Sequence, residues 1–280
     1  MIFRTEVDIP KPTFSIEPLE QMLFVGSCFA DNISRKLIDN KFSCDANPFG
    51  VLYNPLSVAQ SLQTLLHERY YTENDLQYAN GQWVSLMHHG SFSSADKDEC
   101  LNGINERIRL GAANLRKARI AIITWGTARV YEWSADGSIV GNCHKLPEKM
   151  FRRRLLDVDE IVEKYVSLIS EILNCNPDLH FLFTVSPIRH AKDGFHGNQL
   201  NKATLLIALH KICKQLPCCH YFPSYEIMMD ELRDYRFYAD DMLHPSPLAV
   251  EYIWQCFCDT YFKQDTLQIM RQWEDIRKGI

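Results

Sequence analysis

Residues 22–37, MLFVGSCFADNISRKL, form the stretch that decides the fold. The stretch opens with an apolar run at 22–25, which is typical of a buried strand. Gly26 and Ser27 then interrupt the run, and glycine tolerates the backbone angles of a sharp turn. Apolar residues recur after the turn at the spacing of one helical face: Phe29, Ile33 and Leu37. The pattern predicts a strand, a tight turn and a helix.

The same order of strand and helix returns along the chain. Apolar and β-branched runs at 120–124 and 180–185 are typical of strands that are covered on both faces, and a shorter run follows at 219–222. Helical patterns lie between and after these runs, at 95–118, 158–173, 199–216 and 248–262. Such alternation indicates right-handed crossovers and a mostly parallel sheet with helices on both faces.

Three further segments complete the expected architecture. Residues 45–55 carry turn chemistry at both ends and predict a long loop between the first two helices. Asn80-Gly81 predicts a small β-hairpin within 78–86, because both residues tolerate positive φ. We expect a single domain over residues 1–280, with 263–280 as a helical extension that packs on the domain.

Composition excludes several classes of function. The chain has 280 residues, of which 46% are hydrophobic, so it can bury a large core. A net charge of -5 argues against nucleic acid as a partner, and we interpret Arg152-Arg153-Arg154 as a solvated loop or helix start without a function. No apolar run approaches the length of a membrane span, and residues 1–8 lack the pattern of a secretion signal.

The ten cysteines point to a reducing compartment. Their spacing is irregular, unlike the disulfide framework of a small secreted protein, so we expect free thiols in the cytoplasm. Cys218-Cys219-His220 and the pair Cys256 and Cys258 do not suit a metal, because neighbouring residues in a strand or helix point in different directions. We therefore expect no metal and no cofactor.

Ser27 is the first candidate for chemistry. It follows a strand and precedes a helix, where its hydroxyl would be exposed and the amides of Ser27 and Cys28 would be free to donate hydrogen bonds. That position suits a nucleophile and half of an oxyanion hole. A structural alternative is that Ser27 simply caps the helix, since serine is common at helix starts.

The segment 240–245, Asp-Asp-Met-Leu-His-Pro, is the second candidate. An aspartate three residues before a histidine can orient the imidazole, so Asp241 would hold His244. His244 would then take the proton of Ser27 and return it to the leaving group. The alternative is that His244 only caps or packs against the helix that follows.

These residues carry a resemblance to a known family. Gly26-Ser27-Cys28-Phe29-Ala30 resembles the motif that names the GSCFA family, a branch of the SGNH/GDSL hydrolase-like superfamily. The resemblance implies a flavodoxin-like three-layer α/β/α fold and ester hydrolysis or acyl transfer by Ser27 and His244, with Asp241 behind the histidine. It covers the chain to about residue 262 through further similar segments: Asn47-Pro48-Phe49-Gly50, Trp125-Gly126-Thr127-Ala128, Asn142-Cys143-His144-Lys145-Leu146-Pro147, Ser186-Pro187 and Asp241 to His244.

The oxyanion hole departs from the superfamily pattern. The superfamily places an asparagine two residues after a strand-end glycine, whereas Gly126 is followed by Thr127 and Ala128. Asn142 and His144 are candidates to replace that donor. Further candidates for the oxyanion hole or for substrate binding are Cys28, Gly50, Gly126, Thr127 and His89. Cys28 is also an alternative nucleophile, although we expect it to supply an amide and to pack its side chain.

Three functions remain open at this point. The first is a serine esterase or acyltransferase acting on an O-acyl ester, such as an acetylated carbohydrate, through Ser27, Asp241 and His244. The second is a non-catalytic module that binds a glycan or metabolite, which the missing asparagine favours. The third is a metal-dependent hydrolase, for which the sequence offers no suitable histidine spacing. The partner would be a small-molecule or glycan ester, and the oligomeric state is not encoded in any pattern.

Overall fold

A five-stranded parallel sheet forms the centre of the protein in this computed structural model, which describes residues 4–278. Its strand order is β2-β1-β5-β9-β10, which is the flavodoxin-like order. The strands are β1 (Met22–Gly26), β2 (Cys44–Ala46), β5 (Ile120–Trp125), β9 (His180–Val185) and β10 (Cys219–Tyr221). The expected α/β class, with a mostly parallel sheet, is confirmed.

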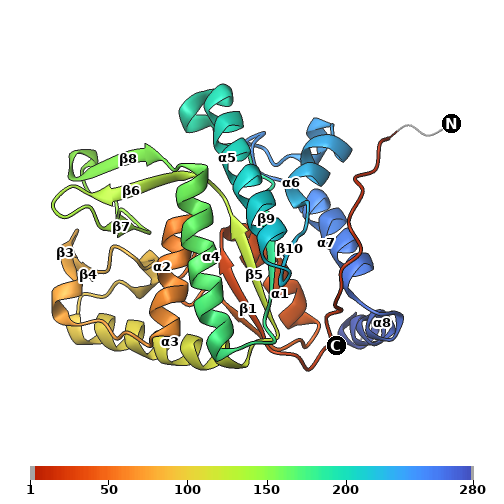
Figure 1. Ribbon diagram of the computed structural model, residues 1–280, viewed down its shortest axis with the longest axis horizontal. Helices are drawn as coiled ribbons and strands as arrows, with labels where there is room; N and C mark the ends of the chain where they lie inside the picture. The colour runs from red at the N-terminus through yellow and green to blue at the C-terminus, as the bar shows by residue number, and fades with distance from the viewer. Residues whose placement is uncertain (1–3, 279–280) are drawn as a thin grey trace.

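Helices cover both faces of the sheet (Figure 1). One face packs against α2 (Pro55–Leu66), α3 (Lys97–Lys117), α4 (Val158–Cys175) and α5 (Gly194–Gln215). The other face packs against α1 (Cys28–Asp39), the short α6 (Ser224–Glu226) with the turn that follows it, and α7 (Pro247–Tyr261). Successive residues of β1 alternate between the two clusters, because side chains of a strand point to opposite faces.

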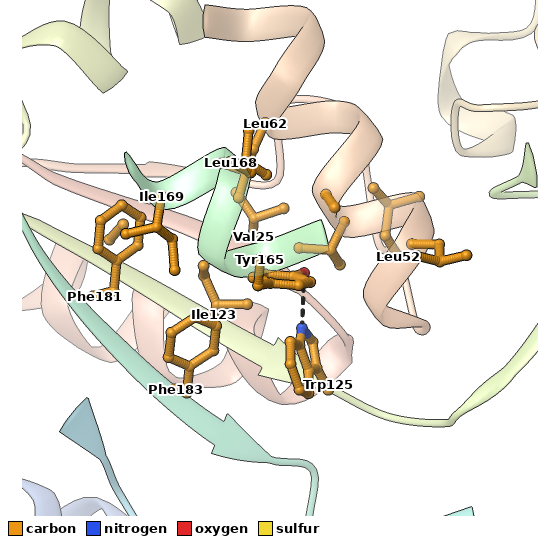
Figure 2. Close-up of a cluster of buried hydrophobic side chains, with 14 of the residues drawn as sticks. Val25, Leu52, Leu62, Ile123, Trp125, Tyr165, Leu168, Ile169, Phe181 and Phe183 are labelled. Carbon is orange, nitrogen blue, oxygen red and sulfur yellow. Dashed lines mark hydrogen bonds between the residues drawn. The ribbon is translucent and has the colours of Figure 1, made fainter. Parts of the chain in front are cut away.

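An aromatic cluster fixes the end of β5 against α4. The indole Nε1 of Trp125 donates to the hydroxyl of Tyr165 over 3.0 Å (Figure 2). That hydroxyl donates to the carbonyl of Pro55 over 2.9 Å. Phe183 packs edge-on against both rings. These partners satisfy the polar atoms of two buried aromatic side chains, so the strand end stays in one position.

Two smaller sheets lie beside the main one (Figure 1). The predicted hairpin is β3 (Gln77–Ala79) and β4 (Gln82–Val84), and both turn residues, Asn80 and Gly81, have positive φ as expected. The second is an antiparallel sheet that the sequence did not predict. It comprises β7 (Ile139–Val140), β6 (Arg129–Trp133) and β8 (Phe151–Leu155).

The three consecutive arginines lie on β8, so their assignment to a loop or helix start was wrong. Arg152 and Arg154 both bind Glu132 of β6, whose side chain is buried. Arg153 points to the other face of the strand and binds Asp193 through both terminal nitrogens. The alternation follows from the two-residue period of a strand.

A short edge strand and a C-terminal helix complete the fold. The predicted loop at 45–55 includes part of β2, which pairs with β1 and forms one edge of the sheet. At the C-terminus, α8 (Gln264–Lys278) packs on the domain as expected, and the indole of Trp273 donates to the carbonyl of Asp39 over 2.7 Å. Residues 279–280 of the expected extension lie outside the described part of the chain.

Candidate active site

The site lies at the carboxyl edge of the sheet, where the strand order reverses between β1 and β5. Ligands of open α/β sheets bind at this point because the two crossovers leave in opposite directions and open a crevice. The Gly26-Ser27 turn ends β1, and Gly126 and Thr127 follow the paired strand β5. Ser186 follows β9, which pairs with β5 in parallel, and its amide donates to the carbonyl of Trp125 over 2.8 Å, so the ends of all three strands lie along one edge.

The Ser27 hydroxyl caps α1. Its oxygen accepts the amide of Phe29 over 3.3 Å, which is the cap that the structural alternative predicted. The side chain is buried, with 3% of its residue surface exposed, so the expectation of an exposed hydroxyl was wrong. Capping leaves the hydroxyl hydrogen free for another acceptor, and it orients the oxygen at the positive end of a helix.

Gly26 is held tightly against the neighbouring strand. Its φ is +145°, and a Cβ placed there would lie 2.2 Å from the carbonyl oxygen of Thr124. The amide of Gly26 donates to the side chain of Asn47 over 2.8 Å, and Asn47 donates in turn to Asp31 of α1 over 2.5 Å. These contacts join the turn, the following loop and the first helix into one unit.

Most of the expected oxyanion amides are already occupied. The amide of Ser27 donates to Thr124, and the amide of Gly50 donates to Asn47. The amides of Gly126 and Thr127 both donate to the carbonyl of Tyr53. The expectation of a free Ser27 amide was therefore wrong. The amide of Cys28 is the first of α1, and the first amides of a helix have no acceptor within the helix.

Asp241 holds His244 as the spacing predicted. The Oδ2 atom of Asp241 lies 2.5 Å from Nδ1 of His244, and its Oδ1 atom accepts the amides of Leu243 and His244, each over 2.9 Å. These amides and the histidine lower the pKa of Asp241 to about 2, so the group is a carboxylate at neutral pH. His244 is half exposed, and its Nε2 is free to act as a base.

The side chains of Ser27 and His244 are not hydrogen-bonded to each other. Both residues belong to the described part of the chain, and no hydrogen bond joins their side chains there. Catalytic hydrogen bonds are often long before substrate binds and shorten in the reactive complex. The fold places the two segments at the same edge of the sheet: Ser27 follows β1, and the amide of Arg189, which follows β9, donates to the carbonyl of Leu243 beside His244 over 3.2 Å.

Cys28 has a different position from the one expected. Its side chain is exposed rather than packed, and Sγ lies 3.4 Å from the hydroxyl of Tyr53. Burial of that phenol, followed by its contact with Cys28, raises the pKa of Tyr53. The tyrosine is consequently neutral and can exchange a hydrogen bond with the thiol.

A cavity of about 530 Å³ adjoins this turn through Tyr53. Two predicted substrate contacts, His89 and Asn142, line it together with Thr127. His144 does not line it, because its ring binds the carbonyl of Ser85 over 2.9 Å instead. The complete lining is Val51, Tyr53, Asn54, His89, Thr127, Arg129, Tyr131, Val140, Gly141, Asn142, Cys143, Arg153, His190, Lys192 and Asp193.

Comparison with known proteins assigns the chain to a family. The model of the GSCFA family matches residues 21–257, which is most of the chain. The chain belongs to the GSCFA family. A search of curated proteins gives no match. Among solved structures, the GSCFA chain is similar to a Clostridium thermocellum family 3 carbohydrate esterase at 10% identity and a TM-score of 0.38, over 90% of this chain and 96% of that chain.

Two residues of the GSCFA chain that sequence reasoning missed hold the strand ends in place. Lys202 of α5 is fully buried, and its ammonium donates to the carbonyls of Gly126 and Ser186 over 2.8 and 3.0 Å. Burial lowers its pKa to about 7. His190 donates to the same Gly126 carbonyl over 2.9 Å. No sequence pattern marks Lys202, because it occupies an ordinary inward position of a helix.

His190 also connects the cavity to the candidate base. It lines the cavity, and the segments that carry His190 and His244 meet through their backbones, because the amide of Arg189 donates to the carbonyl of Leu243 over 3.2 Å. Burial, followed by the charge of Lys202, lowers the pKa of His190 to about 4, so its ring is neutral. It therefore donates one hydrogen bond and does not compete with His244 for protons near neutral pH.

Residues 4–278 of the GSCFA chain contain neither a cluster of potential metal ligands nor a helix suited to span a membrane. No cluster of three or more histidine, cysteine, aspartate or glutamate side chains in this range could hold a metal ion. No helix in the same range combines the length and the apolar character needed to cross a membrane.

Proposed function

We propose that this protein is a serine esterase or acyltransferase that acts on an O-acyl ester, with Ser27 as the nucleophile. The observation that carries the proposal is the 2.5 Å contact between Asp241 and His244, at the carboxyl end of a sheet whose first strand ends in Gly26-Ser27. A carboxylate behind a histidine fixes the tautomer that leaves Nε2 as the base. The GSCFA motif and the flavodoxin-like strand order agree with the SGNH/GDSL resemblance.

The proposed reaction has two steps. In the first step, the Ser27 oxygen attacks the ester carbonyl, its proton moves to Nε2 of His244, and the leaving alcohol takes that proton as the C–O bond breaks. In the second step, His244 removes a proton from water or a sugar hydroxyl, whose oxygen attacks the acyl-serine carbonyl. The bond between the acyl carbon and the Ser27 oxygen then breaks, and that oxygen takes the proton back from His244. Asp241 stabilises the imidazolium in both steps.

The amide of Cys28 and the side chain of Asn142 are the proposed oxyanion donors. The Cys28 amide lies at the start of α1, where the helix dipole favours negative charge. Asn142 lines the cavity, and its Oδ1 accepts the amide of His144 over 2.9 Å. That bond orients the side chain so that its NH₂ group is the part left to donate. His144 acts here through its backbone rather than as a substrate contact.

We take an acylated carbohydrate as the substrate class, because many members of the superfamily that the motif resembles act on acylated glycans. The cavity beside Tyr53 is large enough for a sugar ring. Cytoplasmic location remains a prediction that rests on the ten cysteines at irregular spacing.

Hydrolysis of p-nitrophenyl acetate and labelling by a fluorophosphonate probe test the proposal together. Ser27→Ala should lose both signals, and Ser27→Gly should lose them too while preserving most of the helix cap. Cys28→Ala is the matched control at the neighbouring position and should retain both signals. Loss in Cys28→Ala with retention in Ser27→Ala would make the thiol the nucleophile and reject the proposal.

A glycan- or metabolite-binding module is the second candidate. The observation that favours it is the internal use of the amides of Ser27, Gly126 and Thr127, which leaves few donors for an oxyanion. A binding module should show neither probe labelling nor hydrolysis, yet should bind a sugar in calorimetry. Metal analysis of the purified protein tests the metal-dependent hydrolase independently.

A further inference from the structure

The cavity beside Tyr53 has a positively charged wall. Arg129, Arg153 and Lys192 line it, and Asp193 is the one carboxylate among its lining residues. His190 is neutral there because burial lowers its pKa to about 4. The lining therefore carries more positive than negative charge, although the whole chain has a net charge of -5.

Arg153 and Asp193 neutralise one another. The two terminal nitrogens of Arg153 bind the two carboxylate oxygens of Asp193 over 2.5 and 2.6 Å, which is the bidentate geometry of a strong ion pair. Arg153 holds the pKa of Asp193 below its usual range. This pair occupies both oxygens of the lining carboxylate. Arg129 reaches Asp193 only at 3.7 Å, and Lys192 lies 3.5 Å from Glu148, which is not part of the lining.

Arg129 has poorly satisfied hydrogen-bonding groups. Its Nε is buried without an acceptor, and it lies 3.7 Å from Asp193, which is too far for a hydrogen bond. An arginine presents five N–H donors in a rigid fork, and buried donors are normally paired. The Nε of Arg153 is also buried without an acceptor, but both of its terminal nitrogens bind Asp193. Lys192 donates to the hydroxyl of Tyr131 over 3.0 Å and to Glu148 over 3.5 Å. Among these lining cations, Arg129 is thus the one whose side chain has an ion-pair contact but no side-chain hydrogen bond within the described residues.

The positive wall adjoins the proposed nucleophile. Tyr53 belongs to the same lining, and its hydroxyl is 3.4 Å from Sγ of Cys28, the residue after Ser27. His190 also lines the cavity, and the preceding residue, Arg189, donates its amide to the carbonyl of Leu243, the residue before His244, over 3.2 Å. A ligand in the cavity would consequently lie beside the turn that carries Ser27 and beside the segment that precedes His244, with Arg129 on β6.

We propose that the substrate carries an oxyanion, a carboxylate or a phosphate, and that Arg129 and Lys192 bind this group. The inference rests on the proposed function in taking the cavity as the place where the sugar of the ester is held. An acidic sugar such as a uronic acid would present its carboxylate to the guanidinium fork while its acyl group faces Ser27. A neutral sugar offers hydroxyl acceptors but no negative charge, so it would form only the weaker hydrogen bonds to Arg129 and Lys192, whereas an oxyanion would form charge-assisted ones.

Calorimetric binding in the Ser27→Ala background tests the inference apart from catalysis. The probes are methyl glucuronide for the carboxylate, glucose 6-phosphate for the phosphate and methyl glucoside as the neutral sugar. We expect one of the two anions to bind at least about tenfold more tightly than the neutral sugar, with affinity that falls as salt rises. The tighter of the two anions identifies the source of the charge.

Two variants make the assignment specific. Arg129→Gln should weaken binding of the anion by about tenfold or more and leave the neutral sugar unchanged, since a charged hydrogen bond contributes roughly 1.5–3 kcal/mol. Arg152→Gln is the matched control, because this neighbouring arginine binds Glu132 and does not line the cavity. Equal binding of neutral and anionic sugars, no binding of either anion, or unchanged anion affinity in Arg129→Gln would overturn the inference. Hydrolysis of acetyl esters by the parent protein decides the proposed function separately.

Discussion

Replacing Gly26 by alanine tests the close approach of β1 to β5. The added Cβ would lie 2.2 Å from the carbonyl oxygen of Thr124, which is much shorter than a normal van der Waals contact. The alanine would also have to adopt the φ of +145° that glycine has at this position. The contact cannot be relieved by a side-chain rotation, because the atom it meets belongs to the backbone of the central strand. Overpacking of this kind costs about 1–3 kcal/mol, and the unfavourable backbone conformation adds about 1–2 kcal/mol. We therefore expect Gly26→Ala to lower the free energy of unfolding by about 3 kcal/mol.

Gly81→Ala is the control for that prediction. Gly81 also has a positive φ, at +81°, but a Cβ there meets no atom within 4 Å. This variant should lose only the conformational part, about 1 kcal/mol. Urea unfolding followed by circular dichroism gives both values from the midpoints and slopes. Equal losses in the two variants would refute the argument that contact with Thr124 makes glycine necessary at position 26.

Three further predictions concern charged groups. Lys202→Met should remove a pH dependence of stability. Burial lowers the pKa of Lys202 in the folded protein to about 7 from its usual 10.5, so unfolding of the parent takes up a proton between these pH values and its stability should rise with pH there, which urea unfolding at several pH values measures. Glu132→Gln should lower the free energy of unfolding by about 2–3 kcal/mol, because it leaves two arginines without their buried carboxylate. Since these arginines lower the pKa of Glu132, the difference from the parent in urea unfolding should shrink as pH falls below the usual glutamate value of 4.5. Asp241→Asn should reduce kcat for ester hydrolysis by about 10²–10⁴-fold. Because the pKa of the parent Asp241 is about 2, this carboxylate stays ionised near neutral pH, and its titration should not shape the parent pH–rate profile there.

The main sheet and its helices could be predicted because their signals are local. The strand predicted at 180–185 matches β9, because a continuous apolar run marks it. The helix predicted to begin at Val158 also begins there in the structure, because Asp157 caps its first turn. The hairpin at Asn80-Gly81 was equally visible, because its turn needs residues that accept positive φ. The residues that specify each of these elements lie within a few positions of one another in the sequence.

The small antiparallel sheet could not be predicted, because its strands do not alternate between apolar and polar residues. Residues 152–154 are all arginines, and they are tolerated in a strand because Glu132 and Asp193 supply carboxylates from distant segments. β2 was missed for a related reason, since three residues are too few to show a period. These elements depend on partners that the local sequence does not reveal.

The sequence predicted which residues belong to the candidate site, but not how deeply they are buried or which of their amides are already hydrogen-bonded. Asp241 and His244 are three residues apart, so their contact follows from local geometry. The burial of Ser27 and the occupied amides of Gly126 and Thr127 depend on Thr124 and Tyr53, which come from other elements. A sequence motif can name the chemical groups, whereas their accessibility is decided by the three-dimensional packing around them.

The strand order has a consequence for synthesis of the chain on the ribosome. β1 leaves the ribosome early, but its neighbour β5 begins only at Ile120, and residues 27–119 take roughly 5–20 s to translate. During that interval the apolar edge of β1 has β2 alone as a strand partner, and an unpaired apolar edge is a template for aggregation. The nascent chain therefore has a defined period of vulnerability, in which binding by a chaperone to residues 22–25 would favour a high yield of folded protein.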